Sequence, residues 1–302
     1  MHFSVMAAES LELLAVRPDR IYLDSTTGLG GHTALIAQRL ERGFVIANDR
    51  DPQSLEMARQ NTQALAERIR FHQGTFGTLA ETVRSEGLET VDGLLADLGV
   101  SRYQLTAPER GFSFLADGPL DMRMDPTQGM TAADLVNYNA EEALADLIFQ
   151  FGEERRARKV ARAIVRARPI RSTLHLANVV ERAVHRTGRL HPATKTFMAL
   201  RMAVNDEPGE LDRLLETGPE LLRDGGRMVV ISFMSIDDRK VKVGFRELAR
   251  QGRARLLTKH PLVPGDRETA ENAASRSAKL RAIEIIERGN QDHHGDHAGI
   301  LR

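Results

Sequence analysis

The chain has 302 residues, and its 42 Lys and Arg balance its 42 Asp and Glu, so the formal net charge is zero. The absence of cysteine excludes disulfides, thiolate metal sites and a cysteine nucleophile. No run of about 18 apolar residues is present, which argues against a membrane span. These features predict a cytoplasmic protein without membrane association. We expect no metal site, because a flexible polar tail explains His293, His294 and His297 better than a zinc centre does.

Short apolar segments alternate with helical patterns through the first hundred residues. Strands are expected at 20–24, 44–49, 68–72 and 91–97. Asp51-Pro52 is a typical helix start, with Asp as the N-cap and Pro in the first turn. Such alternation at short spacing predicts a parallel sheet with right-handed crossovers.

The alternation stops near residue 101, and helical patterns fill much of the chain to residue 205. It then resumes with a helix at 207–223, a strand at 227–233, a helix at 237–251 and strands near 254–259 and 279–286. We therefore predict an α/β fold with one sheet of about seven strands, formed by residues 1–100 and 206–288. Residues 101–205 form an inserted helical domain, and residues 289–302 a disordered tail.

A glycine-rich turn follows the first strand, where a parallel sheet binds its ligand. Gly28, Gly30 and Gly31 allow the backbone to approach that ligand closely. Asp24 ends the first strand, where it can face a cationic ligand, and Asp49 ends the second, where it can accept hydrogen bonds from ribose hydroxyls. A tight turn without a ligand is the simpler alternative.

Two details favour S-adenosylmethionine over a nicotinamide dinucleotide. Asp24 would repel a pyrophosphate, and Thr33 stands where the dinucleotide fingerprint has its third glycine. Asp97 ends the fourth strand, where it can accept a hydrogen bond from a substrate N–H or from the cofactor. The alternative for Asp97 is a structural acid at a strand end or helix N-cap.

Basic residues are concentrated in one part of this neutral chain. Residues 153–201 hold 13 Lys or Arg and 3 acids, a local excess of +10. Four of these residues recur at helical spacing and predict one cationic stripe: Arg155, Lys159, Arg162 and Arg166. A solvated charged face is the usual explanation for a single charged helix, but an excess over about fifty residues favours contact with nucleic acid.

Motifs across nearly the whole chain resemble the ribosomal RNA small subunit methyltransferase H family. The matching blocks are 24–33 (DSTTGLGGHT), 48–52 (NDRDP), 91–100 (VDGLLADLGV), 109–114 (ERGFSF), 117–125 (DGPLDMRMD), 151–155 (FGEER), 191–197 (HPATKTF), 199–207 (ALRMAVNDE) and 275–281 (SRSAKLR). The resemblance implies an S-adenosylmethionine-dependent enzyme that methylates N4 of a cytidine (C1402) in the decoding centre of 16S rRNA. It also implies a seven-stranded, Rossmann-like methyltransferase sheet in which the helical insertion, 101–205, serves substrate recognition.

The resemblance also implies roles for individual residues. Gly30, Gly31 and His32 would contact the methionine end of the cofactor, Asp49 the ribose and Phe76 the adenine. Asp97 and Gln104 would contact the remaining cofactor surface. Asp97 is also our candidate for the group that accepts an N4 proton. Arg201, together with Asp121, Arg123 and Asn205, would shape the RNA side, although structural salt bridges explain that group equally well.

One departure from the family pattern lies close to the expected site. Met234 stands where the family pattern Ser-Phe-His-Ser has histidine. A second hypothesis is therefore a ribosome-binding assembly factor that keeps the fold with weakened catalysis, and a nicotinamide oxidoreductase is a third. The expected partner is 16S rRNA or the small ribosomal subunit. Both a monomer and a dimer are compatible with the sequence.

Overall fold

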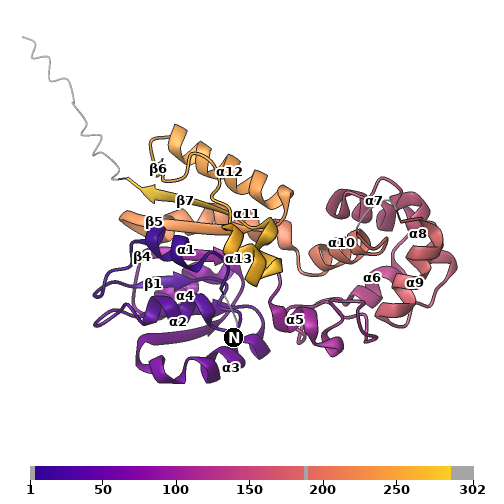
Figure 1. Ribbon diagram of the computed structural model, residues 1–302, viewed down its shortest axis with the longest axis horizontal. Helices are drawn as coiled ribbons and strands as arrows, with labels where there is room; N and C mark the ends of the chain where they lie inside the picture. Colours follow the sequence, from indigo (N-terminus) through magenta and orange to yellow (C-terminus); the bar gives the residue numbers. More distant parts are fainter. Residues whose placement is uncertain (1–3, 187–189, 287–302) are drawn as a thin grey trace, which may run out of the picture.

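The computed structural model describes residues 4–186 and 190–286, and Figure 1 shows two lobes. One lobe holds the sheet and is built from the two ends of the chain. The other is built from helices of the middle of the chain. The tail that we predicted to be disordered, 289–302, lies outside the described residues.

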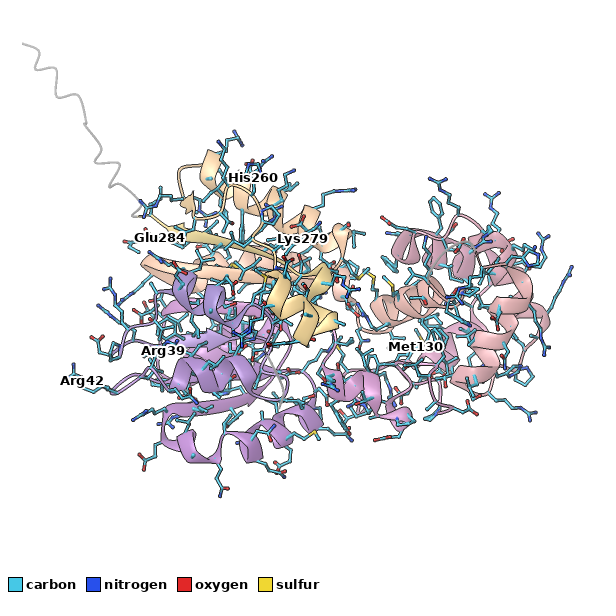
Figure 2. The ribbon with its side chains drawn as sticks, viewed as in Figure 1. Arg39, Arg42, Met130, His260, Lys279 and Glu284 are labelled. Atoms are coloured by element: carbon cyan, nitrogen blue, oxygen red, sulfur yellow. The ribbon has the colours of Figure 1, made fainter. Side chains whose placement is uncertain are left out.

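A seven-stranded sheet in the order β3-β2-β1-β4-β5-β7-β6 forms the centre of the first lobe. Among the described strands, β7 runs antiparallel to both of its neighbours, β5 and β6, and all the other pairs are parallel. Lys279 and Glu284 mark the two ends of β7 in Figure 2, and Lys279 lies on the side of the helical lobe. The parallel strands therefore point their carboxyl ends toward that lobe. The strands are β1 (Tyr22–Asp24), β2 (Val45–Asp49), β3 (Ile69–Gln73), β4 (Val91–Asp97), β5 (Leu222–Ser232), β6 (Ala254–Leu256) and β7 (Lys279–Ile285).

Helices cover both faces of the sheet, and two apolar clusters fill the space between. They are α1 (Ala7–Leu14), α2 (Gly31–Ala37), α3 (Pro52–Asn61), α4 (Leu79–Ser85), α11 (Glu207–Thr217), α12 (Ser235–Arg250) and α13 (Asp266–Glu271). Asp51 caps α3, as predicted, because its carboxylate accepts hydrogen bonds from the backbone N–H groups of Gln53 and Ser54. The predicted fold class, a seven-stranded Rossmann-like methyltransferase sheet, is confirmed.

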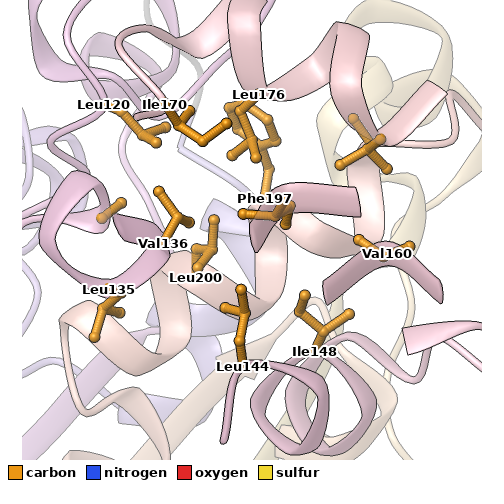
Figure 3. Packing of buried hydrophobic residues seen from close by; sticks show 14 of the residues in the cluster. Leu120, Leu135, Val136, Leu144, Ile148, Val160, Ile170, Leu176, Phe197 and Leu200 are labelled. Atoms are coloured by element: carbon orange, nitrogen blue, oxygen red, sulfur yellow. The ribbon is translucent and has the colours of Figure 1, made fainter. Parts of the chain in front are cut away.

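The helical lobe has its own apolar core, shown in Figure 3. Leu144 and Ile148 from one helix meet Val160, Phe197 and Leu200 from two others in this cluster. The segment comprises α5 (Arg102–Thr106), α6 (Ala132–Tyr138), α7 (Glu141–Gly152), α8 (Ala157–Arg166), α9 (Thr173–Ala183) and α10 (Thr194–Val204). No strand occurs among its described residues, and the boundaries at 100/101 and 205/206 stay a prediction.

Two details differ from the sequence prediction. The helix expected at 207–223 ends at Thr217, and β5 already begins at Leu222, ahead of the Asp224-Gly-Gly turn. Arg155 precedes α8 and is not part of the helical stripe with Lys159, Arg162 and Arg166. The chain leaves α7 through Glu153 in the left-handed conformation, which delays the next helix to Ala157. No helix among the described residues is long and apolar enough to cross a membrane.

Candidate active site

A cavity of about 740 Å³ opens at the carboxyl edge of the parallel strands. The glycine turn after β1 lines it, as do the ends of β2, β4 and β5 and the segment around α5. Of the predicted cofactor residues, Gly31, His32, Asp49, Phe76, Asp97 and Gln104 lie on its wall. The fold therefore brings together, at one cavity, residues that are far apart in the sequence.

The glycine turn has the backbone geometry that the sequence predicted. Gly28 and Gly30 have φ values of 51° and 87°, a region that L side chains rarely adopt. A Cβ at Gly30 would lie 2.9 Å from the Thr62 methyl carbon and 3.3 Å from the Ala58 Cβ. Gly30 is absent from the cavity wall, so it serves the turn, while Gly31 lines the cavity directly.

Asp49 connects this turn to the end of β2. Its Oδ2 accepts a hydrogen bond from the Gly28 N–H at 2.7 Å, and its Oδ1 accepts one from the Asp51 N–H at 2.9 Å. Burial raises the pKa of Asp49 to about 6, and the neighbouring carboxylates of Asp51 and Asp24 add to the rise. Asp49 lines the cavity at the position where the sequence predicted a ribose contact.

Asp24 does not lie where we expected it. The carboxylate is fully buried and does not line the cavity, so the predicted direct contact with the cofactor is wrong in this geometry. Thr33 Oγ1 donates to its Oδ2 at 2.6 Å, and the Thr26 N–H donates to its Oδ1 at 3.2 Å. Burial raises the pKa of Asp24. Asp24 therefore supports the turn from behind.

Asp97 and His32 lie close together on the cavity wall. The Asp97 Oδ2 lies 3.8 Å from His32 Nδ1, while His32 Nε2 lies 3.0 Å from the Val5 carbonyl oxygen. The Oδ1 of Asp97 is buried without a hydrogen-bond partner among the described residues. Burial raises the pKa of Asp97 to about 6, and Asp24 contributes to the rise. An unpaired buried acceptor of this kind is available to a donor or a cation that enters the cavity.

Phe76 and Gln104 lie on the wall as predicted, and they differ in whether the backbone or the side chain makes hydrogen bonds. Phe76 is partly buried, and its backbone N–H donates to Glu210 Oε2 at 2.8 Å. The Gln104 side chain is already engaged, because its Nε2 donates to Asp51 Oδ2 at 2.8 Å and its Oε1 accepts from the Ser101 N–H. Gln104 thus orders α5 against α3 as well as lining the cavity.

Sequence reasoning missed two segments that line the cavity. Ser4 and Val5, at the start of the described chain, lie on the wall beside His32. The Met6 N–H donates to Glu268 Oε1 at 2.8 Å, so α13 holds this N-terminal segment in place. The end of α13 and the residues that follow it, including Glu271 and Asn272, also line the cavity. Neither segment carries a motif that predicts these contacts.

Another part of the cavity wall is formed by α10, α11 and the start of α12. Arg201 donates from Nε and Nη2 to the two carboxylate oxygens of Glu207 at 2.7 and 2.8 Å. Its Nη2 also lies 3.6 Å from the sulfur of Met234. The structural alternative considered for Arg201 thus has geometric support, and its RNA contact stays a prediction. Asp237, which sequence reasoning did not single out, lines this wall.

The other residues predicted to contact RNA are of two kinds: exposed cations, and residues held by structural contacts. Arg155, Lys159, Arg162 and Arg166 are exposed, and of these Arg162 lies 3.2 Å from Glu141 in an ion pair. Ala157, Val160, Ala161 and Ile164 form the buried face of α8. Asp121 and Arg123 pair with each other at 2.7 Å, and buried Asn205 bonds the backbone of Met122 and Met124, which are structural contacts.

The sheet order and the carboxylate-lined cavity define a class of protein, the cofactor-dependent methyltransferases of Rossmann-like fold. The model of the MraW methylase family matches residues 1–286, and the chain belongs to that family. S-adenosylmethionine is its cofactor. The cavity fits this group, because the unpaired Asp97 oxygen and the buried carboxylates of Asp24 and Asp49 favour a cationic ligand.

Comparison with named proteins agrees with this family. The chain is 70% identical over 285 residues to the ribosomal RNA small subunit methyltransferase H of Solibacter usitatus, covering 94% of this chain and all of that protein. It is 48% identical to the same enzyme of Acidobacterium capsulatum, covering 94% of this chain and 98% of that one. The structure of a putative methyltransferase from Streptococcus mutans, solved in complex with SAH, matches this one with a TM-score of 0.46 at 12% sequence identity. The match covers 94% of this chain and 100% of that one.

Proposed function

We propose that this protein transfers a methyl group to N4 of a cytidine, C1402, in the decoding centre of 16S rRNA. The 70% identity to an enzyme named as a small-subunit rRNA methyltransferase, over that enzyme's full length, carries this proposal. The exposed cations of α8 support an RNA substrate. The position on the RNA and the N4 atom rest on the family resemblance of the sequence blocks.

S-adenosylmethionine supplies a methyl group on a sulfonium that is its own leaving group. The protein therefore has to align the acceptor nitrogen and exclude water. The lone pair of cytosine N4 is delocalised into the ring, so a group that accepts an N4–H helps to localise it. Asp97 suits this role, because its Oδ1 is buried, unpaired and on the cavity wall. To reach the cavity, the target base has to leave its stack.

The proposed function is tested by mapping the methyl group. The protein is incubated with labelled cofactor and with small subunits, or free 16S rRNA, from cells that lack this modification. Label on N4 of C1402 is the expected result. Label on a protein, on a cytosine carbon or on another nucleotide would contradict the assignment.

The same experiment in single-turnover form decides the assembly-factor alternative. That hypothesis expects cofactor binding and subunit binding without transfer. Met234, which motivated that hypothesis, lines the cavity beside Arg201, and no hydrogen bond joins it to Asp97 among the described residues. We therefore expect stoichiometric methylation within one turnover.

A further inference from the structure

Asp237 is a second carboxylate on the wall of the proposed methylation site. It lies in the first turn of α12, which follows β5 directly, and it lines the same cavity as Asp97 at the end of β4. The strands β4 and β5 are neighbours, with Asp97 opposite Ile231. The loops that carry the two acids therefore leave the same edge of the sheet side by side.

The carboxylate of Asp237 is not used by the fold. Among the described residues it has no hydrogen bond and no ion pair within 4 Å, whereas its neighbour Asp238 accepts a hydrogen bond from Arg281 at 2.7 Å. Arg201, a cationic residue on the same part of the wall, is held by Glu207 through two hydrogen bonds. Arg281 thus holds Asp238 in place, whereas the position of Asp237 in the first turn of α12 is electrostatically favourable but leaves its oxygens without a hydrogen bond among the described residues.

The surroundings of Asp237 make it a better proton acceptor than an ordinary aspartate. Burial raises its pKa to about 6, and Glu207 of α11 adds to the rise, while Arg201 of α10 and Lys240 of α12 oppose it. A carboxylate with a pKa near 6 is ionised at neutral pH and still binds a proton more strongly than a solvated one. Asp97 and Asp237, which line the same cavity, thus share this property.

We propose that Asp237 accepts a hydrogen bond from the amino group of the target cytosine and takes the proton that this nitrogen loses. The inference rests on the function proposed above. In the step, the N4 lone pair forms the new N–C bond and the S–C bond breaks, with its electron pair left on sulfur. The N–H electron pair then returns to nitrogen as the proton moves to the carboxylate, so charge and atoms balance.

This assignment also explains how the site would distinguish cytidine from uridine. An amino group offers two N–H donors, which one carboxylate at the end of β4 and another in the first turn of α12 can accept. The carbonyl oxygen of uracil in that place would face two negative charges and leave both acceptors unpaired. A site built around buried acceptors rejects an analogue that lacks the donor.

The experiment compares Asp237→Asn with Glu247→Gln on the same helix. Glu247 is 46% exposed and pairs with Arg250, far from the cavity, so its variant loses one carboxylate without touching the site. Single-turnover methylation, cofactor affinity and the pH–rate profile are measured for both, and Asp237→Glu is tested for rescue.

We expect Asp237→Asn to slow transfer by about 10²-fold or more, the usual contribution of one acid–base group. Its cofactor affinity should stay within about twofold, and its rate should fall less steeply below pH 6 than that of the wild type. Asp237→Glu should recover part of the rate, and Glu247→Gln should match the wild type.

Two results would overturn the role of Asp237 while the proposed function stands. One is an active wild type whose rate and acid limb are unchanged in Asp237→Asn. The other is a loss of rate that only parallels a loss of cofactor affinity or folding, since that assigns Asp237 to structure. A wild-type protein that leaves C1402 unmethylated would overturn the proposed function itself, and with it this inference.

Discussion

Thr33 donates a 2.6 Å hydrogen bond from its hydroxyl to the fully buried carboxylate of Asp24. The two residues join the start of α2 to the end of β1, behind the glycine turn. The same threonine distinguishes this turn from a dinucleotide fingerprint in the sequence. Its structural purpose is now clear, because a buried carboxylate without donors is costly and Thr33 supplies one.

Replacing Thr33 by Val removes this donor and keeps the shape of the side chain. We expect the free energy of unfolding to fall by about 1–3 kcal/mol, the cost of leaving a buried polar group without its partner. Chemical denaturation of the cofactor-free protein measures it. Thr33→Ser keeps the hydroxyl and is the control. Equal stability of the Val and Ser variants would show that the bond contributes nothing.

The affinity for S-adenosylmethionine should depend on pH through Asp97. Burial raises its pKa to about 6, so the carboxylate is largely protonated at pH 5 and largely ionised at pH 7. A cationic ligand binds the ionised form better, and binding should tighten by about tenfold between these two values. Calorimetric titration across this range measures the dissociation constant.

Asp97→Asn should bind the cofactor with a flatter pH dependence, and it should lose more in transfer rate than in affinity. Equal losses of rate and affinity would assign Asp97 to the cofactor alone.

The raised pKa of Asp97 also affects the stability of the protein without ligand. The folded protein holds this proton up to about pH 6 and the unfolded chain only to about 3.8, so the contribution of Asp97 to stability declines as pH rises through that window.

The sequence predicted the strand ends well because strand periodicity and strand-terminal acids are local signals. Asp49 and Asp97 follow buried strands and reach the cavity, as expected from the geometry of parallel sheets. Asp24 shows the limit of this logic. It also ends a strand, but whether its side chain reaches the ligand or a neighbouring hydroxyl depends on the packing of the turn, which local sequence does not encode.

Other parts of the site depend on contacts between distant segments. Val5 meets His32 through its backbone carbonyl, and a backbone atom leaves no trace in the choice of residue. Asp237 and Asp238 are identical neighbours in the sequence, yet Arg281 engages only the second. Arg155 fits the helical spacing of the cationic stripe, but the left-handed Glu153 places it ahead of α8.

The exposed cations of α8 should contribute to RNA binding through counterion release. We expect Lys159→Ala/Arg166→Ala to weaken binding to the small subunit and to lower the slope of log affinity against log salt, by about 0.7–0.9 per lost phosphate contact. Cofactor affinity should not change. Filter binding over a range of salt concentrations measures the slope.

The matched control for these cations is Arg39→Ala/Arg42→Ala. Both arginines are exposed in the segment between α2 and β2, on the side of the sheet lobe away from the helical lobe (Figure 2). Their removal changes the net charge by the same amount at a surface that we do not expect to meet RNA. If the slope of log affinity against log salt were equal for the two double variants, the cations of α8 would affect RNA binding only through the net charge of the protein.

Among the ion-paired residues around the cavity, Arg110 should contribute most to the free energy of unfolding. Its side chain is buried, and its Nη1 donates to Asp51 Oδ2 at 2.8 Å, while its Nη2 donates to the carbonyl oxygens of Arg123 and Met124. One guanidinium thus joins the cap of α3, beneath the cofactor wall, to the loop that leads into the helical lobe.

Removal of this guanidinium in Arg110→Ala leaves the fully buried Asp51 with one donor fewer and two carbonyls without partners. We expect a loss of about 3–5 kcal/mol in the free energy of unfolding, as for other broken buried ion pairs. Arg162→Ala, which breaks the exposed pair with Glu141, should cost less than about 1 kcal/mol. Denaturant unfolding followed by circular dichroism measures both. Similar losses in the two variants would show that the buried network does not stabilise the junction, because burial is the main physical difference between the two pairs.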